Sequence, residues 1–263
     1  MAEREDSFVA VERVGNAVCL VLDRPGRGNA LVPELLCDLR GAIERASTLH
    51  PPALILTGRG RAFSAGGDVS AFADAAGDPD RLQAFSSEIV GELNGAILDL
   101  LAFPAPVIAL VNGPVTGGSA GLVLASDIVL MSESAFLQPW YAEVGFCPDG
   151  GWTALLPERI GAARAMAAQV FNTRYSPADC LSLGLAHALA APEDLEALLQ
   201  TTVAQITQKD AGTLAMARSL IWSPERRERV ASALERERQG FLQLVGRAET
   251  ARRMMAFLGK GSA

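Results

Sequence analysis

The stretch APVIALVNGPVTGGSAGLVLASDIVL, residues 105–130, decides the fold class. It opens with VIALV at 107–111, a short apolar run that predicts a buried strand. A glycine-rich turn follows, then an apolar helical segment at 120–125 and a second strand pattern at 127–132. A strand, a turn, a helix and a strand in this order are typical of an α/β core whose sheet is covered by helices.

The flanking sequence repeats this alternation and then abandons it. Valine-rich runs at 8–14 and 17–22 surround Gly15-Asn16 and predict a hairpin, and helical spacing at 33–47 precedes a short strand at 53–58. Beyond residue 192 the strand signal disappears, and helices are predicted at 193–208, 210–222, 224–244 and 247–258. The chain therefore divides near residue 195 into an α/β core and a helical C-terminal region.

One segment of the core carries no periodic pattern. Residues 72–81, FADAAGDPDR, are small, acidic and rich in turn formers, so we expect a mobile surface loop there.

Composition excludes several classes of function. The net charge of −7 opposes binding to a phosphate backbone, and the longest apolar runs end well before the roughly 18 residues of a membrane span. The cysteines and histidines are scattered and form no metal-binding spacing, which favours reduced thiols in a cytoplasmic protein without a metal. These scattered residues are Cys19, Cys37, Cys147, Cys180, His50 and His187.

The glycine turn at 117–121 allows two interpretations. GGSAG fits the G-x-S-x-G of a hydrolase, with Ser119 as nucleophile. However, five residues separate the strand from this turn, and His187 is the only histidine downstream. The favoured interpretation is that Gly117 and Gly118 open a helix whose bare N–H groups bind an oxyanion.

A second glycine turn supports the oxyanion interpretation. RAFSAGGDVSAF, residues 61–72, places Gly66-Gly67 directly before Asp68, where another helix can begin. Two such turns could converge on one carbonyl oxygen. Two N–H donors would stabilise a thioester enolate, each contributing roughly 2.7–4 kcal/mol.

Taken together, five segments resemble the crotonase superfamily, the enoyl-CoA hydratases and isomerases. They occur in the family's order and spacing and cover nearly the whole chain. These segments are LDRPGRGNAL (22–31), RAFSAGGD (61–68), the stretch 105–130, VGFCPDGGWTALLPERIGAARA (144–165) and AFLGKG (256–261).

The resemblance implies a crotonase-like spiral of β-β-α turns, followed by a helical region used in trimerisation. Residues 1–195 would be the acyl-CoA-binding core, and 196–263 would assemble a homotrimer or a dimer of trimers. The substrate would be an acyl-CoA thioester, so no separate cofactor is implied.

The resemblance also implies a set of site residues. The oxyanion hole would be the backbone N–H groups of Gly67 and Gly118. From the residues themselves, Asp68 is interpreted as a helix-start acid that orients the loop, and residues 72–90 with those around Trp140 are expected to shape the acyl pocket. Tyr141 could hydrogen-bond the substrate or simply fill that pocket. The coenzyme A contacts would be Ala62, Phe63 and Ala65 along the adenine and pantetheine path, Arg24 and Arg27 near the phosphates, and Phe257 and Lys260 reaching a ligand of the neighbouring subunit.

The sequence departs from the family at both hydratase glutamates. Gly121 and Tyr141 stand at those positions, so the usual route of water addition is not expected, because it needs a positioned acid and base.

One carboxylate remains at a position that the family uses. Asp149 lies four residues after Gly145, where isomerases resembling those of the phenylacetate pathway carry a proton-shuttling aspartate. The 4-chlorobenzoyl-CoA dehalogenase branch uses this aspartate as a nucleophile, but it needs an upstream histidine to activate water, and there is none between His50 and His187. A double-bond isomerase is therefore favoured, since one base can remove a proton and return it elsewhere.

Several alternatives stay open at this level. Asp149 could instead cap a helix predicted at 151–156, and that position would lower its pKa whereas apolar neighbours would raise it. The protein could be a hydratase or another enolate-forming enzyme that uses a different carboxylate. It could also be a non-catalytic member that binds acyl-CoA.

Overall fold

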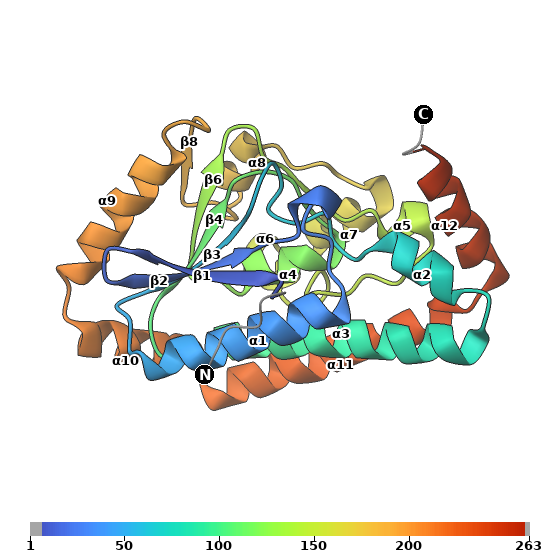
Figure 1. Cartoon of the computed structure of the whole chain (residues 1–263), viewed down its shortest axis with the longest axis horizontal. Helices are drawn as coiled ribbons and strands as arrows, with labels where there is room; N and C mark the ends of the chain where they lie inside the picture. The colour runs from blue at the N-terminus through green and yellow to red at the C-terminus, as the bar shows by residue number, and fades with distance from the viewer. Residues whose placement is uncertain (1–6, 261–263) are drawn as a thin grey trace.

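The computed structural model describes residues 7–260, apart from the side chain of Lys260, and is built on one central sheet (Figure 1). The strand order is β1-β2-β3-β4-β6-β8, in which β1 and β2 form the predicted antiparallel hairpin and every later pair is parallel. The strands are Val9–Val14 (β1), Ala17–Leu22 (β2), Leu54–Gly58 (β3), Val107–Val111 (β4), Ile128–Ser132 (β6) and Ala188–Ala190 (β8).

Helices cover both faces of this sheet. On one face lie α1 (Pro33–Thr48) and α3 (Pro79–Ala102), with α11 (Pro224–Val245) packed against α3 (Figure 1). On the other face, α9 (Leu195–Thr207) packs through Leu195, Leu199 and Val203. Alternate strand residues serve the two faces, which is the period-2 pattern of a sheet buried on both sides.

The elements that build the site follow the carboxyl ends of β3, β4 and β6, except for α12 (Ala248–Lys260), which comes from the C-terminal region. The others are β5 (Val115–Thr116), η2 (Gly117–Ser119), α4 (Ala120–Leu124), β7 (Leu137–Gln138), α2 (Val69–Ala75) and α5 (Tyr141–Val144). The helix α12 contacts both α2 and α5, and Figure 1 shows the three together at one end of the molecule.

The remaining elements are short helices in different parts of the chain. The helix η1 (Pro25–Arg27) follows β2, the helices α6 (Leu156–Ile160), α7 (Ala162–Phe171) and α8 (Pro177–Ser182) precede β8, and α10 (Ala211–Ile221) belongs to the C-terminal region. With α9, α10, α11 and α12 in place, the four predicted C-terminal helices are confirmed. Within residues 7–260, no helix has the length and apolar character needed to cross a membrane.

The prediction of a loop over 72–81 is wrong. The segment holds most of α2 and the start of α3, and only residues 76–78 connect them. Phe72 and Ala75 are buried, so α2 is held by packing that small residues do not signal. The turn-like sequence DPDR is a helix start, because the Asp78 side chain accepts from the amides of Asp80 and Arg81.

Candidate active site

A cavity of about 650 Å³ opens between the two glycine turns, α3, α5 and the C-terminal helices. Its inner wall is apolar, with Ile89, Val90 and Leu93 contributed by α3. Phe72, Phe146 and Phe241 also line it, and their ring centroids lie 4.9 to 5.6 Å apart. Such a pocket suits an apolar group attached to a polar anchor.

The two predicted glycine turns meet backbone to backbone. Ser64 donates its amide to the Pro114 carbonyl and accepts from the Thr116 amide, each at 3.1 Å. Gly66 has a φ of +77°, and a Cβ there would lie 2.5 Å from the Thr116 oxygen. Glycine is therefore required at this contact.

This contact brings Gly67 and Gly118 into the same cavity lining. Gly118 lies in the first turn of η2, where N–H groups have no acceptor within the helix. Gly67 and Gly118, from different turns, thus line one cavity, which is what the expected oxyanion hole requires.

Ser119 has a structural place in this arrangement. Its side chain is fully buried, and its hydroxyl donates to the carbonyls of Thr116 at 2.8 Å and Ser64 at 3.1 Å. The only downstream histidine, His187, accepts the Val129 amide on β6. Ser119 therefore ties the turns together and lacks the histidine partner that a nucleophilic serine needs.

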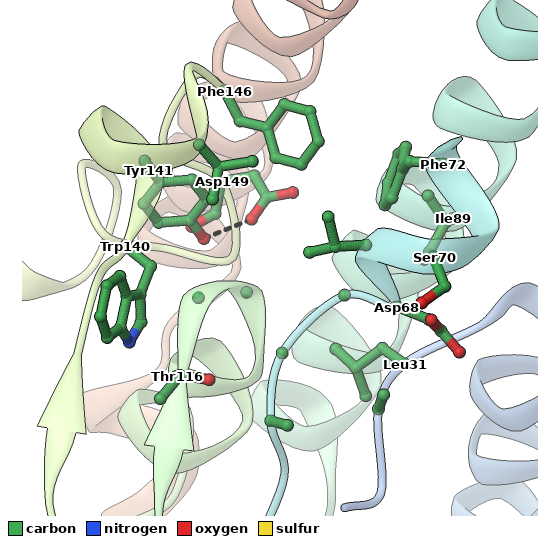
Figure 2. Close-up of a pocket in the computed structure, with 18 of the residues that line it drawn as sticks. Leu31, Asp68, Ser70, Phe72, Ile89, Thr116, Trp140, Tyr141, Phe146 and Asp149 are labelled. Atoms are coloured by element: carbon green, nitrogen blue, oxygen red, sulfur yellow. Dashed lines mark hydrogen bonds between the residues drawn. The ribbon is translucent and has the colours of Figure 1, made fainter. Parts of the chain in front are cut away.

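Asp149 lies on the cavity wall beside Gly118. It is 7% exposed, and a Cβ built on Gly118 would lie 2.8 Å from its Oδ1. The Tyr141 hydroxyl donates to Oδ1 at 2.5 Å and to the Asp149 carbonyl at 3.1 Å (Figure 2). Tyr141 stays protonated because burial and the Asp149 charge raise its pKa well above the usual value.

The environment of Asp149 decides whether its pKa is raised by apolar neighbours or lowered by a helix start. Burial raises the pKa of Asp149 to about 7, and it prevails over the hydrogen bond from Tyr141, which favours the charged form. The predicted helix at 151–156 is wrong: residues 150–155 form turns, and α6 begins at Leu156. The backbone amide that acts on the Asp149 carboxyl is its own, and α6 begins seven residues later, so Asp149 does not cap a helix.

Asp68 is the other acid in the cavity lining, on the side opposite Asp149 (Figure 2). It occupies the N-cap position of α2 and pairs with Arg24 at 2.8 Å and Arg27 at 3.1 Å. Burial opposes its ionisation, but the hydrogen bonds from both arginines outweigh burial and hold the pKa of Asp68 below its usual value. The two acids therefore differ: Asp68 is a fixed anion and Asp149 a carboxyl that titrates near neutrality.

The position of one missing glutamate has no room for a side chain. A Cβ on Gly121 would lie 2.4 Å from both the Gly150 oxygen and Ile97 Cδ1. At the other position, Tyr141 is buried against Asp149 and Trp152. The hydratase pair is thus replaced by a packed backbone contact and a tyrosine–aspartate pair.

The structure brings together only part of the predicted coenzyme A set. Arg27, Ala65, Trp140 and Phe257 line the cavity with Asp68 and Tyr141. Arg24, Ala62 and Phe63 lie outside that lining; Arg24 is engaged by Asp68, and Phe63 is fully buried in the core. The side chain of Lys260 lies outside the described residues.

Phe257 lines the cavity of its own chain. The contact with a neighbouring subunit's ligand that the resemblance implied stays a prediction. The Phe257 ring lies 5.6 Å from that of Trp140, so α12 forms one wall of the site.

Sequence reasoning missed Glu237, which is 3% exposed and lies on α11. It belongs to a run of alternating charges that resembles a solvated helix face. The available signal was its spacing, because Glu237 shares one helical face with the buried residues Val230, Leu234, Phe241 and Val245.

No group of three or more histidine, cysteine, aspartate or glutamate side chains within residues 7–260 is arranged to hold a metal ion.

Comparisons with known proteins agree on one family. A family model described as enoyl-CoA hydratase/isomerase matches residues 13–263. The chain is 31% identical to a 1,2-epoxyphenylacetyl-CoA isomerase of Escherichia coli, with 92% of each chain covered. It is 34% identical to a probable enoyl-CoA hydratase of Rhodobacter capsulatus over 63% of this chain and 62% of that protein, so it spans less than two thirds of that relative.

A solved structure shares the fold of this chain. The structure matches the crystal structure of an enoyl-CoA hydratase from Bacillus halodurans with a TM-score of 0.88. The match covers 95% of this chain and all of that one, at 24% sequence identity. It confirms the predicted mixed α/β fold with C-terminal helices.

Proposed function

The chain belongs to the enoyl-CoA hydratase/isomerase family, also called the crotonase superfamily, and we propose that within it the protein is an enoyl-CoA double-bond isomerase. The observation that carries this proposal is the isolation of Asp149. Among the described residues that line the cavity it is the one carboxyl without a cationic partner, since Asp68 is held by two arginines. A single base beside an oxyanion hole is what moving a double bond requires.

The proposed reaction starts with the thioester carbonyl of a 3-enoyl-CoA accepting the amides of Gly67 and Gly118. Asp149 removes a proton from carbon 2, and the electron pair passes to the carbonyl oxygen as a dienolate. Asp149 then returns the proton to carbon 4, and the double bond comes to lie between carbons 2 and 3. No atom is gained or lost, so no water has to be activated.

Tyr141 has a defined part in this proposal. Its hydroxyl donates to Asp149 Oδ1, which leaves Oδ2 as the oxygen that meets the substrate. Because this bond favours the carboxylate, it offsets part of the effect of burial. Asp149 thus keeps a pKa suited to accepting a proton and giving it back.

The pH dependence of turnover follows from the pKa of about 7 for Asp149. Only the carboxylate accepts a proton from carbon 2, so kcat/KM should fall about tenfold per pH unit well below that pKa. It should rise through pH 7 and level off above it. Initial rates with a 3-enoyl-CoA across this range test the prediction, and a flat profile would contradict it.

The direct test of the function uses two substrates with the purified protein. A 3-enoyl-CoA should become conjugated, as followed by ultraviolet absorbance, while a 2-enoyl-CoA should gain no water by mass. Hydration of the 2-enoyl substrate would instead establish a hydratase that uses another carboxylate. Binding of both without change would establish a non-catalytic acyl-CoA-binding member.

The acyl group is the less defined half of the substrate. The three phenylalanine rings of the inner wall favour an unsaturated or aromatic acyl chain over a polar one. The isomerase that the chain resembles over 92% of its length acts, by its name, on an epoxyphenylacetyl thioester, which places a phenyl-bearing substrate among those to assay first.

Assembly is also proposed as the resemblance suggests, as a homotrimer or a dimer of trimers. Large apolar side chains are exposed on α7 and α10, namely Met166, Val170, Phe171, Met216, Leu220 and Ile221. An apolar surface of this kind favours burial against another chain. Light scattering should give a mass of three or six chains of 27.6 kDa, and a monomer would contradict this.

Both the core and the C-terminal region would then contribute to the active site and to assembly. Residues 1–195 supply the oxyanion hole, Asp149 and the exposed apolar side chains of α7, while 196–263 supply those of α10 and also Phe241 and Phe257 of the cavity wall. Four free cysteines agree with a reducing compartment such as the cytoplasm.

A further inference from the structure

We propose that Glu237 is a positioning residue for Asp149, fixing the turn that follows it and keeping a second negative charge behind its carboxyl. The inference rests on the role proposed for Asp149. Glu237 lies 88 residues further along the chain, on a helix that the predicted site did not include.

The geometry is a carboxylate surrounded by donors. Glu237 Oε2 accepts the Gly151 amide at 2.8 Å, and Oε1 accepts the amides of Thr153 at 2.7 Å and Ala154 at 2.9 Å. The Thr153 hydroxyl donates to Oε1 at 2.7 Å as well. These four bonds fix the turn within five residues of Asp149, and bonds to a charged acceptor are the stronger kind.

The carboxylate form matters for this set of bonds. Glutamine at 237 would keep one acceptor oxygen but would turn an NH2 group toward one of the donating amides. No arginine or lysine within residues 7–260 forms an ion pair with Glu237, so its charge is not neutralised locally. A buried charge without a cation is costly, and the four donors offset part of that cost, although burial still raises the pKa of Glu237 above its usual value.

The packing of α11 holds the Glu237 carboxylate in place. Leu234 and Phe241, one turn before and one turn after, are both buried. Phe241 packs against Phe146, which precedes Asp149 by three residues, so α11 contacts the segment on both sides of the acid. A displacement of Glu237 would therefore shift the position of the Asp149 carboxyl.

The charge of Glu237 also acts directly on the site. Asp149 faces Tyr141 from α5, Cys147 from its own loop and Glu237 from α11, while α3 presents the apolar Leu93. The hydrogen bond from Tyr141 favours the Asp149 carboxylate, whereas the charge of Glu237 disfavours it and adds to the effect of burial on the pKa. Tyr141 and Glu237 therefore shift the pKa of Asp149 in opposite directions.

The test measures the ionisation of Asp149 itself, in protein labelled with 13C-aspartate and without substrate. Isotope-edited infrared spectroscopy follows the carboxyl band that disappears in Asp149→Asn. In Glu237→Gln the midpoint should move to lower pH by roughly 1 unit. With a 3-enoyl-CoA, kcat should fall while KM changes little, and the acid limb should move with the midpoint.

The matched control is Glu235→Gln on the same helix. Glu235 is solvent-accessible and pairs with Arg238, so the same chemical change there should alter neither the midpoint nor kcat. A midpoint that is unchanged in Glu237→Gln would overturn the proposal, since a purely structural glutamate would leave it in place.

A second variant covers the case in which Glu237→Gln fails to fold. Glu237→Asp keeps the charge but shortens the reach, so the midpoint should stay while kcat falls. Wild-type kcat in Glu237→Asp would refute the positioning role. If Asp149→Asn itself leaves turnover intact, the proposed function fails, yet the infrared midpoint still reports whether Glu237 acts on Asp149.

Discussion

Replacing Asp149 by asparagine should lower isomerisation of a 3-enoyl-CoA by roughly 10²–10⁴-fold, the usual contribution of a positioned general base. Asparagine keeps an oxygen that accepts from Tyr141, so the fold and the oxyanion hole should persist. Affinity for a saturated acyl-CoA, measured by calorimetry, should therefore stay at the wild-type value. Glu143→Gln is the control, because Glu143 is an exposed acid six residues away and should not affect turnover.

The same variant should be more stable than the wild type at neutral and higher pH. A carboxyl whose pKa is raised from 3.8 to about 7 in the folded protein contributes stability in its protonated form. That contribution is full below the unfolded pKa and is lost as the pH rises through 7. Asparagine does not ionise, so at pH 8 thermal unfolding should show a higher Tm for Asp149→Asn; an equal or lower Tm would contradict the burial of a titrating acid.

The second large effect is expected for Gly66→Ala. The new Cβ would lie 2.5 Å from the Thr116 oxygen, at a backbone φ of +77° that alanine disfavours. The two glycine turns would have to separate, and the amides of Gly67 and Gly118 would no longer converge. Loss of one oxyanion donor lowers kcat by roughly 10²–10³-fold.

Gly91→Ala is the matched control for that experiment. Gly91 lies on α3, and a Cβ there would meet nothing within 4 Å, so its alanine variant should turn over like the wild type. Circular dichroism separates a local effect of Gly66→Ala from unfolding. Wild-type kcat in folded Gly66→Ala would show that the contact between the turns does not set the oxyanion geometry.

Local patterns were sufficient for much of the fold and for the glycine turns of the candidate site. The strands β1, β2, β3, β4 and β6, the C-terminal helices and the two glycine turns follow from apolar spacing and from where glycines interrupt it, whereas the short strands β5, β7 and β8 were not predicted. Asp149 was found because the family resemblance gave meaning to one short motif. The pKa of Asp149 could not be predicted from the sequence, because it depends on burial, on the hydrogen bond from Tyr141 and on the charge of Glu237, 88 residues away.

The failures have a common physical origin. Residues 76–78 form the only break between α2 and α3, but Asp78-Pro79 suits a turn and a helix start equally well. Likewise, Glu237 is surrounded in sequence by charged residues, and only its helical phase relative to Leu234 and Phe241 marks it as buried. In both cases tertiary packing chooses between two local structures that the residues permit.

The contact between Gly121 and Gly150 bears on how this family can change its chemistry. Because a Cβ at 121 would lie 2.4 Å from the Gly150 oxygen, a glutamate cannot be installed there by one substitution. The turn at 150 would first have to move, and that turn is held by Glu237. The order of changes is therefore constrained: on a route from this sequence to a site with two glutamates, the turn that follows the proposed base Asp149 would have to loosen before a glutamate could be accommodated at 121.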